Sequence, residues 1–446
     1  MGYSIFGGLF DRGPGISDDA WLQAMLDTEA ALARAAERAG LAPPGTGAAV
    51  TSVADVGHFR GVDLPAAARA TGNPVPALVK ALTALAPPDA AIHLGATSQD
   101  IIDTAAMLIA RRSIDAVLAD LSAAGQRCVA LTRAHAGTVM AGRTLLQQAV
   151  PITFGLVTAN WLTAIDEART QLHRVRTSRL AIQYGGAAGT LAPLGEAGPA
   201  VADLVAEELG LPAPALPWHT NRLRILDLAA ALTATCAALG KIARDVTLLS
   251  QTEVAEVHEA TGGGSSTMPH KQNPVAAVVI LGHTKQAPHL LATLASAAEQ
   301  EHQRGAGSWH SEWQPLTHLL ALTTSSAAWA ADLLGGLQVD EPRMRANLEA
   351  THGLTQSEHI TTLLTPHLGR QKAHALVSQA TARAAAGNIT LAEALTTSKE
   401  SSATLAACQI TRDQLDVALA PTSYLGATAQ FISRALAAHE SHSSVT

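Results

Sequence analysis

The stretch from His258 to Pro274 gathers residue types that can stabilise negative charge. Three consecutive glycines, Gly262 to Gly264, interrupt an apolar helical pattern, because each glycine loses much backbone freedom when it is ordered. Two serines, Lys271 and Asn273 follow, and Pro274 can begin a new helix. Such a loop can bring backbone N–H groups, a hydroxyl group and a fixed positive charge to one point. It therefore suits an oxyanion: a carboxylate, or the doubly charged form that a carboxylate becomes when the adjacent carbon loses a proton.

Other interpretations of this stretch have to be weighed. A flexible linker is the commonest role of a Gly-Ser-rich loop, although the continuation Met-Pro-His-Lys-Gln-Asn-Pro is not linker chemistry. The stretch is not a P-loop, because Lys271 does not follow the last glycine and neither Ser nor Thr comes after it. It does not contain a zinc motif either, since Gly262 stands where the histidine pair that begins at His258 would need its second member.

A second polar stretch, from His93 to Thr104, reads as a loop that ends at the start of a helix. Thr97, Ser98 and Asp103 are residue types that cap helices, and this structural role is open for each of them. The same hydroxyl groups, with the exposed N–H groups of a helix start, could instead bind an anion. A third stretch, Gly142 to Pro151, is expected to be a loop between two helices and carries Arg143, Thr144 and Gln147.

The composition favours a helical protein with a large core. The chain has 446 residues, of which 48% are hydrophobic, 15% charged and 3% aromatic. Its formal charge of −7 and the lack of a basic run argue against a nucleic-acid partner. Three scattered cysteines indicate neither disulfides nor a metal site. With no 18-residue apolar run and no signal peptide pattern, we expect no membrane span and a cytoplasmic location.

The apolar periodicity predicts several long helices. Earlier in the chain, Ser17 is the expected N-cap of a helix that ends at Gly40, and a shorter helix is expected at 74–85. Five long segments then follow, and the fourth is expected to bend at Pro288. They cover about 103–135, 154–183, 225–258, 274–302 and 316–334. After Gly353 the helices shorten, and the tail from His439 is expected to be disordered.

The segment Gly264 to Asn273 resembles the defining loop of the fumarase/aspartase superfamily, which includes adenylosuccinate and argininosuccinate lyases. Gly142 to Ala149 resembles the second signature region of that superfamily. Three further segments resemble the 3-carboxy-cis,cis-muconate cycloisomerase branch: His93 to Asp100, Trp218 to Arg222, and Glu301 to Trp313. The resemblance covers nearly the whole chain.

The resemblance implies an all-α fold with three helical domains at residues 1–103, 104–352 and 353–446. The central domain would form the twenty-helix core of a homotetramer, and each active site would take loops from three subunits. Ser265 would be the catalytic base, and Lys271 would help to stabilise its alkoxide and the intermediate. The carboxylates of a small polycarboxylate substrate would be held by Thr97, Ser98, Arg143, Thr144, Gln147, Ser266, Met268 and Asn273. This chemistry needs no cofactor or metal.

The activity implied by the resemblance is closure of a lactone ring in 3-carboxy-cis,cis-muconate through an aci-carboxylate intermediate. Two alternatives stay open: a lyase that releases fumarate from a substituted succinate of the nitrosuccinate or adenylosuccinate type, and a non-catalytic structural relative. One departure concerns Leu145, which stands where many of the lyases have histidine and the cycloisomerases usually have tryptophan. The resemblance leaves the roles of His93, His219 and Arg304 open.

Overall fold

The computed structural model describes residues 7–13, 16–260, 263–264, 267–268 and 270–445. Ser265 and Ser266 therefore lie outside the described residues. The chain divides into two compact units. Unit 1 comprises Met1–Ser122, Glu167–Gly240 and Val279–Ala331, and unit 2 comprises Ala123–Asp166, Lys241–Val278 and Asp332–Thr446. The three-domain division at residues 103 and 352 stays a prediction.

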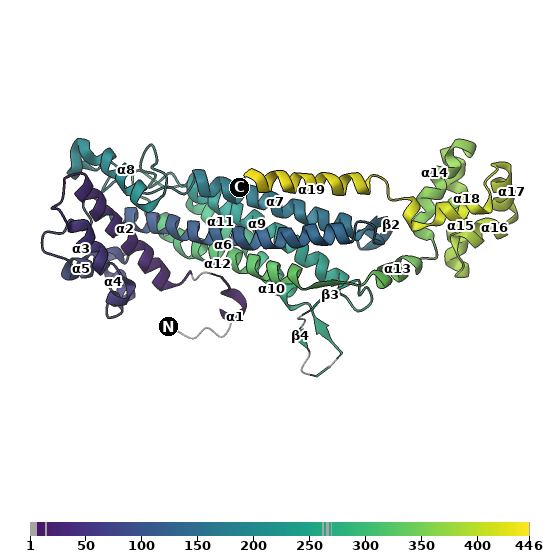
Figure 1. The fold of residues 1–446 in the computed structure, drawn as a ribbon, viewed down its shortest axis with the longest axis horizontal. Helices are drawn as coiled ribbons and strands as arrows, with labels where there is room; N and C mark the ends of the chain where they lie inside the picture. The colour runs from purple at the N-terminus through teal and green to yellow at the C-terminus, as the bar shows by residue number, and fades with distance from the viewer. Residues whose placement is uncertain (1–6, 14–15, 261–262, 265–266, 269, 446) are drawn as a thin grey trace. The chain divides into compact units, whose positions relative to one another are not determined.

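Long helices dominate the chain, as the sequence predicts (Figure 1). The four longest helices are α6 (Ser98–Ala134), α7 (Phe154–Ser178), α9 (Leu223–Leu249) and α12 (Ser308–Gly335). The expectation of a single bent helix at 274–302 is wrong, because this segment forms α10 (Val275–Thr284) and α11 (Ala287–Ala297). Pro288 lies in the first turn of α11, where its missing N–H group would have no intrahelical partner in any case.

Unit 1 also contains shorter helices near the N-terminus. Ser17 caps α2 as predicted, since its side chain accepts a hydrogen bond from the Ala20 N–H group. The helix predicted at 74–85 is α5. The shorter helices of this unit are α1 (Gly7–Phe10), α2 (Asp18–Arg38), α3 (Thr46–Val53), α4 (Leu64–Thr71), α5 (Val75–Leu85) and α8 (Gly198–Leu209), with 3-10 turns at Val56–Phe59 and Ala192–Ala197.

Unit 2 contains the C-terminal helices, most of which are short, as predicted. Apolar residues between Ile360 and Ala418 form a core of their own within this unit. The helices are α13 (Glu341–Glu349), α14 (Ser357–Leu368), α15 (Arg370–Gly387), α16 (Leu391–Thr397), α17 (Lys399–Ala407), α18 (Arg412–Leu419) and α19 (Thr428–Val445), with 3-10 turns at Leu354–Gln356 and Pro421–Ser423.

The expectation of a disordered tail from His439 is wrong. Helix α19 continues to Val445, and His439 is buried. Its Nδ1 lies 2.9 Å from Oδ2 of Asp166 in α7, and Arg133 of α6 pairs with Glu440 at 3.0 Å. These polar contacts are made with residues about 270 and 300 positions earlier, which the composition of the tail does not reveal.

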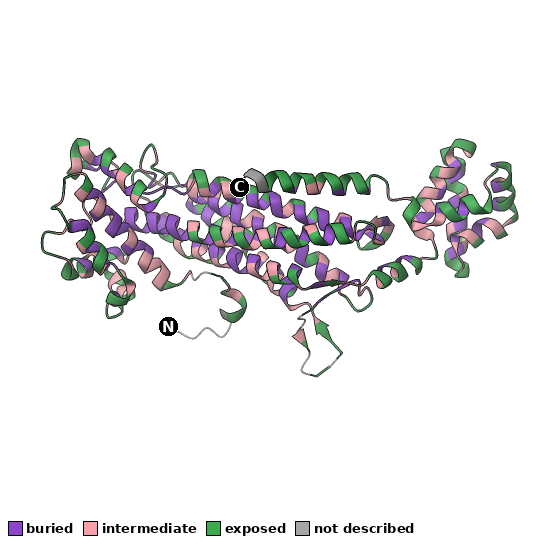
Figure 2. Ribbon diagram, in the orientation of Figure 1, coloured by how far each residue is buried: buried purple, intermediate pink, exposed green. Residues whose placement is uncertain are grey.

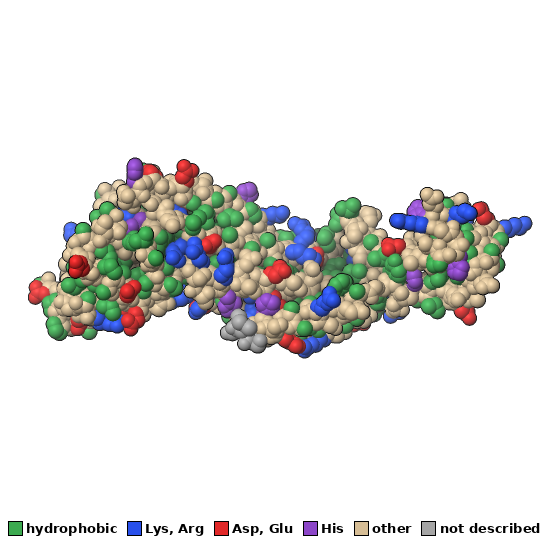
Figure 3. All heavy atoms as spheres, turned by 90° about the horizontal axis from the view of Figure 1, so that it is seen from above, with side chains coloured by type: hydrophobic (Ala, Val, Ile, Leu, Met, Phe, Trp, Pro, Cys, Tyr) green, Lys and Arg blue, Asp and Glu red, His purple; other side chains and the backbone are tan. Residues whose placement is uncertain are grey.

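Buried residues are concentrated along the long helices (Figure 2), and most of the buried apolar residues are alanine or leucine. Small side chains allow helix axes to approach closely. On the face drawn in Figure 3, acidic side chains lie among the basic ones. Helix α9 is long and apolar enough to cross a membrane, and half of its most apolar stretch is buried in the protein. Buried core helices share this length and composition.

The stretch Gly142–Pro151, expected to be a loop, is mostly a β-hairpin in unit 2. Strands β1 (Val139–Thr144) and β2 (Gln147–Thr153) pair antiparallel, with Thr144 opposite Gln147. A bulge lies at Gly142, where a Cβ atom would come within 2.7 Å of the Val150 carbonyl oxygen. The turn consists of Leu145 and Leu146 alone, so the usual Asn-Gly signal of a two-residue hairpin is missing.

Both turn residues adopt backbone conformations that leucine disfavours. Leu145 has φ 52° and Leu146 has φ 65°, and their side chains are 96% and 75% exposed. A left-handed conformation costs a non-glycine residue roughly 1–2 kcal/mol. We therefore expect the double substitution Leu145→Asn, Leu146→Gly to raise the free energy of unfolding by about 1–2 kcal/mol. A higher thermal unfolding midpoint would report it. Leu216→Asn is the matched control, because Leu216 is 77% exposed and is not among the residues with positive φ. An equal change of the unfolding midpoint in the two variants would contradict backbone strain at Leu145 and Leu146.

His283 makes the stability of the protein depend on pH. Burial lowers its pKa to about 4, although the Leu9 carbonyl and Asp11 act in the opposite direction. Between about pH 4 and the ordinary value of 6.5, the unfolded chain therefore binds a proton that the folded chain does not. Stability is lost as the pH falls through this window. We expect His283→Gln to remove a loss on the order of 2–3 kcal/mol between pH 7 and pH 4, measured by chemical denaturation. The exposed His318, changed to Gln, should leave the wild-type pH profile intact.

Candidate functional site

The predicted catalytic loop is an extended arm in unit 2. Strands β4 (Gly263–Gly264) and β5 (Gln272–Asn273) pair antiparallel and form its stem. Towards its end, the Lys271 N–H group donates to the Met268 carbonyl at 3.0 Å, which makes a turn. Lys271 is exposed, Met268 is 42% exposed and Asn273 is half-buried. The arm thus presents a fixed positive charge and an amide.

Glu259 holds the two ends of this arm together. It belongs to β3 (Val257–Glu259), which pairs with β6 (Leu337–Val339). Its buried carboxylate accepts hydrogen bonds from the N–H groups of Ala276 and Ala277, at 3.1 and 3.0 Å. Those two N–H groups belong to the first turn of α10, where a carboxylate is favoured by the helix dipole. Glu259 precedes the arm and α10 follows it, so this contact closes the base of the loop.

Arg143 connects the hairpin to the segment that leads into the arm. Its Nη1 and Nη2 atoms donate to the two carboxylate oxygens of Glu256, at 2.8 and 2.6 Å. Glu256 is fully buried and also accepts a hydrogen bond from Asn347 at 2.9 Å. The bidentate partner that the structure gives to Arg143 is therefore a carboxylate of its own chain. Binding of a substrate carboxylate by Arg143 stays a prediction, as it does for the exposed Thr144 and Gln147 beside the hairpin turn.

Thr97 and Ser98 lie in unit 1 at the N-terminal end of α6, and both are half-buried. The capping contact is made by Asp100, whose Oδ2 accepts the Thr97 N–H group at 3.0 Å. Asp100 is fully buried and also accepts the N–H groups of Gly185 and Gly186, at 3.1 and 2.9 Å. The anion-binding role of Thr97 and Ser98 stays a prediction, and it is compatible with a helix start where N–H groups and hydroxyl groups converge.

A buried polar network fixes this helix start. His219 Nε2 lies 2.6 Å from Asp100 Oδ1, which gives His219 a structural role. One turn further along α6, Asp103 accepts Nη1 of Arg222 at 2.7 Å and Nη2 at 3.0 Å, and the Trp309 indole at 3.0 Å. Asp103 therefore forms an ion pair and does not cap the helix. Arg222 is 2% exposed, and its Nη2 also reaches Glu312 at 2.6 Å.

Two residues whose roles the sequence left open contact this region of unit 1. His93 has φ 57°, and its Nδ1 lies 2.6 Å from the fully buried carboxylate of Glu29. Burial alone would lower the pKa of His93, but the hydrogen bond to Glu29 and the charges of Glu29 and Asp100 outweigh it, so the pKa is raised. Arg304 donates to the carbonyls of Gly186 and Ala187, at 2.5 and 3.1 Å. The contact between His93 and Glu29 thus favours the positively charged form of His93, four residues before Thr97.

The structure thus brings the predicted residues together in two sets. Unit 2 holds the arm and the hairpin, joined through Glu256, and unit 1 holds the start of α6. Sequence reasoning missed Glu256 and Glu259, because isolated glutamates before a glycine-rich loop carry no local signal. Among the described residues, no group of three or more His, Cys, Asp or Glu side chains is arranged to hold a metal ion. The sets combine cations, amides, hydroxyl groups and helix N-termini, which is the chemistry of carboxylate recognition and of oxyanion stabilisation.

Comparisons with known proteins agree with this chemistry. Residues 15–288 match the family described as Lyase, and residues 353–435 match the family described as Adenylosuccinate lyase C-terminus. A 3-carboxy-cis,cis-muconate cycloisomerase from Bradyrhizobium diazoefficiens is 45% identical over 94% of each chain. A nitrosuccinate lyase from Streptomyces davaonensis is 43% identical, covering 94% of this chain and 91% of its own.

Among solved structures, the 3-carboxy-cis,cis-muconate lactonizing enzyme from Pseudomonas putida superposes with a TM-score of 0.91 and 39% identity. The match covers 99% of this chain and 100% of that one, so the fold, including the short C-terminal helices, is shared from end to end. The all-α fold expected from the serine-loop resemblance is confirmed. The chain belongs to the lyase family and is an enzyme of the fumarase/aspartase superfamily.

Proposed function

We propose that this enzyme is a 3-carboxy-cis,cis-muconate cycloisomerase. One carboxylate of the substrate adds across a conjugated double bond and closes a lactone ring, and a proton is added to the carbon beside another carboxylate. The observation that carries the proposal is the 45% identity to a cycloisomerase of that name over 94% of both chains. The resemblance of His93 to Asp100 to that branch, and of Gly264 to Asn273 to its superfamily, supports the proposal.

The difficult species on this path is the aci-carboxylate, which carries two negative charges on one carboxyl group. Lys271 and Asn273 lie on an arm whose base is closed by Glu259, so their approach to the charge is organised before the reaction. In this proposal, Ser265 exchanges the proton and Lys271 stabilises its alkoxide. Ser266 and Met268, on the same arm, contact the substrate.

The remaining carboxylates are held by Thr97, Ser98, Thr144 and Gln147, with Arg143 completing the set. The reaction uses no cofactor or metal. From the resemblance to the superfamily, we propose that complete sites form in a homotetramer, in which each site takes loops from three subunits. A cytoplasmic location, without nucleic-acid or membrane partners, belongs to the same proposal.

A second candidate is a lyase that releases fumarate from a substituted succinate. Leu145 leaves this candidate open, because this exposed residue is neither the histidine of many lyases nor the tryptophan usual in cycloisomerases. The 43% identity to a nitrosuccinate lyase supports the candidate. Both candidates use the same serine arm, so the substrate has to separate them.

Two parallel assays test the proposal. Purified enzyme is mixed with 3-carboxy-cis,cis-muconate, and loss of the diene absorbance is followed in the ultraviolet. The same enzyme is mixed with nitrosuccinate and with adenylosuccinate, and the appearance of fumarate is followed. We expect rapid loss of the diene band and no fumarate. Fumarate release with an unchanged diene band would show that the enzyme is a lyase and not a cycloisomerase. Inactivity in every assay would favour the third interpretation, a non-catalytic structural relative.

A further inference from the structure

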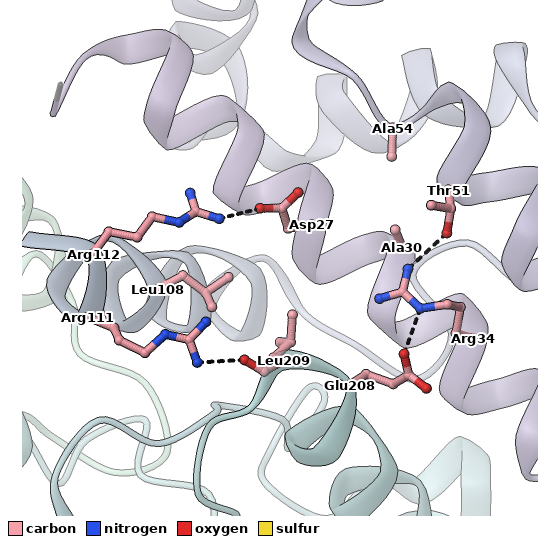
Figure 4. A pocket seen from close by; sticks show the side chains of 10 residues that line it. All are labelled: Asp27, Ala30, Arg34, Thr51, Ala54, Leu108, Arg111, Arg112, Glu208 and Leu209. Carbon is pink, nitrogen blue, oxygen red and sulfur yellow. Dashed lines mark hydrogen bonds and ion pairs between the residues drawn. The ribbon is translucent and has the colours of Figure 1, made fainter. Parts of the chain in front are cut away.

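A pocket of about 240 Å³ lies within unit 1, and neither Thr97 nor Ser98 is among the residues that line it. It is formed where α2, α3, α6 and α8 meet (Figure 4). Arg111 and Arg112 of α6 lie on one side, and Arg34 of α2 lies on the other. Thirteen residues separate Ser98 from Arg111 on α6, which corresponds to roughly 20 Å along the helix. The pocket is therefore separate from that helix start.

The carboxylates that line the pocket are already neutralised. Asp27 pairs with Arg112 at 2.6 Å. Glu208 accepts Arg34 Nε at 2.7 Å and Arg38 Nη1 at 2.8 Å, and these arginines lower its pKa. Three lining arginines stand against two lining carboxylates, so the lining carries one excess positive charge.

Arg111 carries that excess charge. Its Nη1 donates to the carbonyls of Leu209 and Gly210 at the C-terminal end of α8, both at 2.8 Å. No carboxylate of the described residues forms an ion pair with Arg111, and its Nε and Nη2 groups have no hydrogen-bond partner among those residues. Partial burial lowers its pKa; the nearby charge of Asp115 opposes this shift, and the charges of Arg112 and Arg176 add to it. A partly desolvated guanidinium with two available donor groups would gain from a carboxylate that binds it at short range.

Apart from Thr51, whose hydroxyl accepts a hydrogen bond from Arg34 Nη1 at 2.8 Å, the rest of the lining is apolar. Ala30 and Ala54 are almost fully buried, and Leu108 is 2% exposed, so together they form a hydrocarbon floor. The volume corresponds to roughly eight water molecules at about 30 Å³ each. It falls just below the range of drug-sized ligand sites, about 300–1,000 Å³. A charge on one side and an apolar floor on the other select a small amphipathic anion over an inorganic one.

We propose that this pocket binds a short-chain organic carboxylate, with its carboxylate on Arg111 and its hydrocarbon part against Ala30, Ala54 and Leu108. The site is distinct from the helix start that carries Thr97 and Ser98. Because Arg111 and Ser98 share one helix, occupancy of the pocket acts on the element that carries Thr97 and Ser98 at its start.

Butanoate is the probe for this site, with butan-1-ol and inorganic phosphate as comparisons. Binding is measured on the full chain by ligand-observed NMR titration. We expect saturable binding of butanoate and none of butan-1-ol, and phosphate should bind at least about tenfold more weakly. Arg111→Gln should weaken butanoate binding about tenfold or more, as expected for loss of a charged hydrogen bond. Ala54→Leu keeps every charge and fills the floor, and should abolish binding.

The matched control is Arg224→Gln. Arg224 also donates to main-chain carbonyls, those of Ser178 and Arg179 at the C-terminal end of α7, and burial lowers its pKa too. It should leave butanoate binding unchanged, as should Lys271→Met, which removes the cation of the serine arm. The proposal would be overturned if butanoate showed no saturable binding, or if butan-1-ol or phosphate bound as tightly as butanoate. It would also be overturned if Arg224→Gln weakened butanoate binding as much as Arg111→Gln does. Loss of butanoate binding in Lys271→Met together with normal binding in Arg111→Gln would overturn it as well. Arg111→Lys, which keeps the charge, should bind more tightly than Arg111→Gln, so a folding defect in one variant does not decide the outcome.

Discussion

Ser265→Ala is expected to reduce turnover of the proposed substrate by about 10²–10⁴-fold, the usual contribution of a positioned acid or base. Lys271→Met should reduce it by roughly 10²–10³-fold, since it removes one stabilising group from the developing oxyanion. Both effects should appear mainly in kcat, because the charge that these residues stabilise is largest in the transition state. Initial rates of diene loss over a range of substrate concentrations would measure them.

Ser402→Ala serves as the control for this pair. Ser402 is an exposed serine of α17, far along the sequence from the arm, and its loss should leave kcat and KM unchanged. Retention of normal turnover in Ser265→Ala would remove this serine from the mechanism. If only KM rose in Lys271→Met, the lysine would bind substrate without stabilising the intermediate.

The largest loss of stability is expected for Arg222→Met. Arg222 is the only cation that the described hydrogen bonds give to the buried carboxylates of Asp103 and Glu312, and it reaches Asp103 at 2.7 Å. Removing it leaves two buried carboxylates unpaired, which costs about 3–5 kcal/mol. Its ring contact with Trp218, 4.7 Å from guanidinium to centroid, is lost as well. The measurement is the free energy of unfolding, or the thermal midpoint where unfolding is irreversible.

The pH dependence of this variant gives an independent check. Burial already raises the pKa of Glu312, although Arg222 opposes the shift. Without Arg222, the folded-state pKa of Glu312 rises further. The destabilisation of Arg222→Met therefore grows as the pH rises, and it shrinks at low pH, where Glu312 is protonated. The control is Arg412→Met, which breaks an exposed pair with Asp416 and should leave the stability nearly unchanged, because water screens exposed ion pairs. Equal losses in the two variants would contradict the buried network.

Much of the helical architecture could be predicted from local sequence. Apolar periodicity located α6, α7 and α9, and Ser17 marked the start of α2, because these signals act within one or two turns. The break between α10 and α11 was missed, since a proline at a helix start and a proline at a bend give the same local pattern. The C-terminal helix α19 was missed because contacts with Asp166 and Arg133, distant in sequence, hold a polar tail in place.

The candidate site, too, could be predicted only where the signal is local. Anion chemistry is indicated by residue types and spacing alone, at Lys271 and Asn273 and at Thr97 and Ser98. The hairpin at Leu145 and Leu146 could not be predicted, because its turn uses two leucines with positive φ in place of the usual Asn-Gly. The partner of Arg143 could not be predicted either, since Glu256 lies 113 residues away and becomes its partner only in the fold.

The most direct test of the proposed activity follows the fate of the proton. The reaction is run in deuterium oxide with 3-carboxy-cis,cis-muconate, and the product is examined by proton NMR. The account predicts a lactone that carries one deuterium, on the carbon beside a carboxylate and in a single stereochemical position, and predicts that Ser265→Ala forms almost none. An unchanged diene in the presence of folded wild-type enzyme, or a lactone with deuterium in both stereochemical positions, would contradict it.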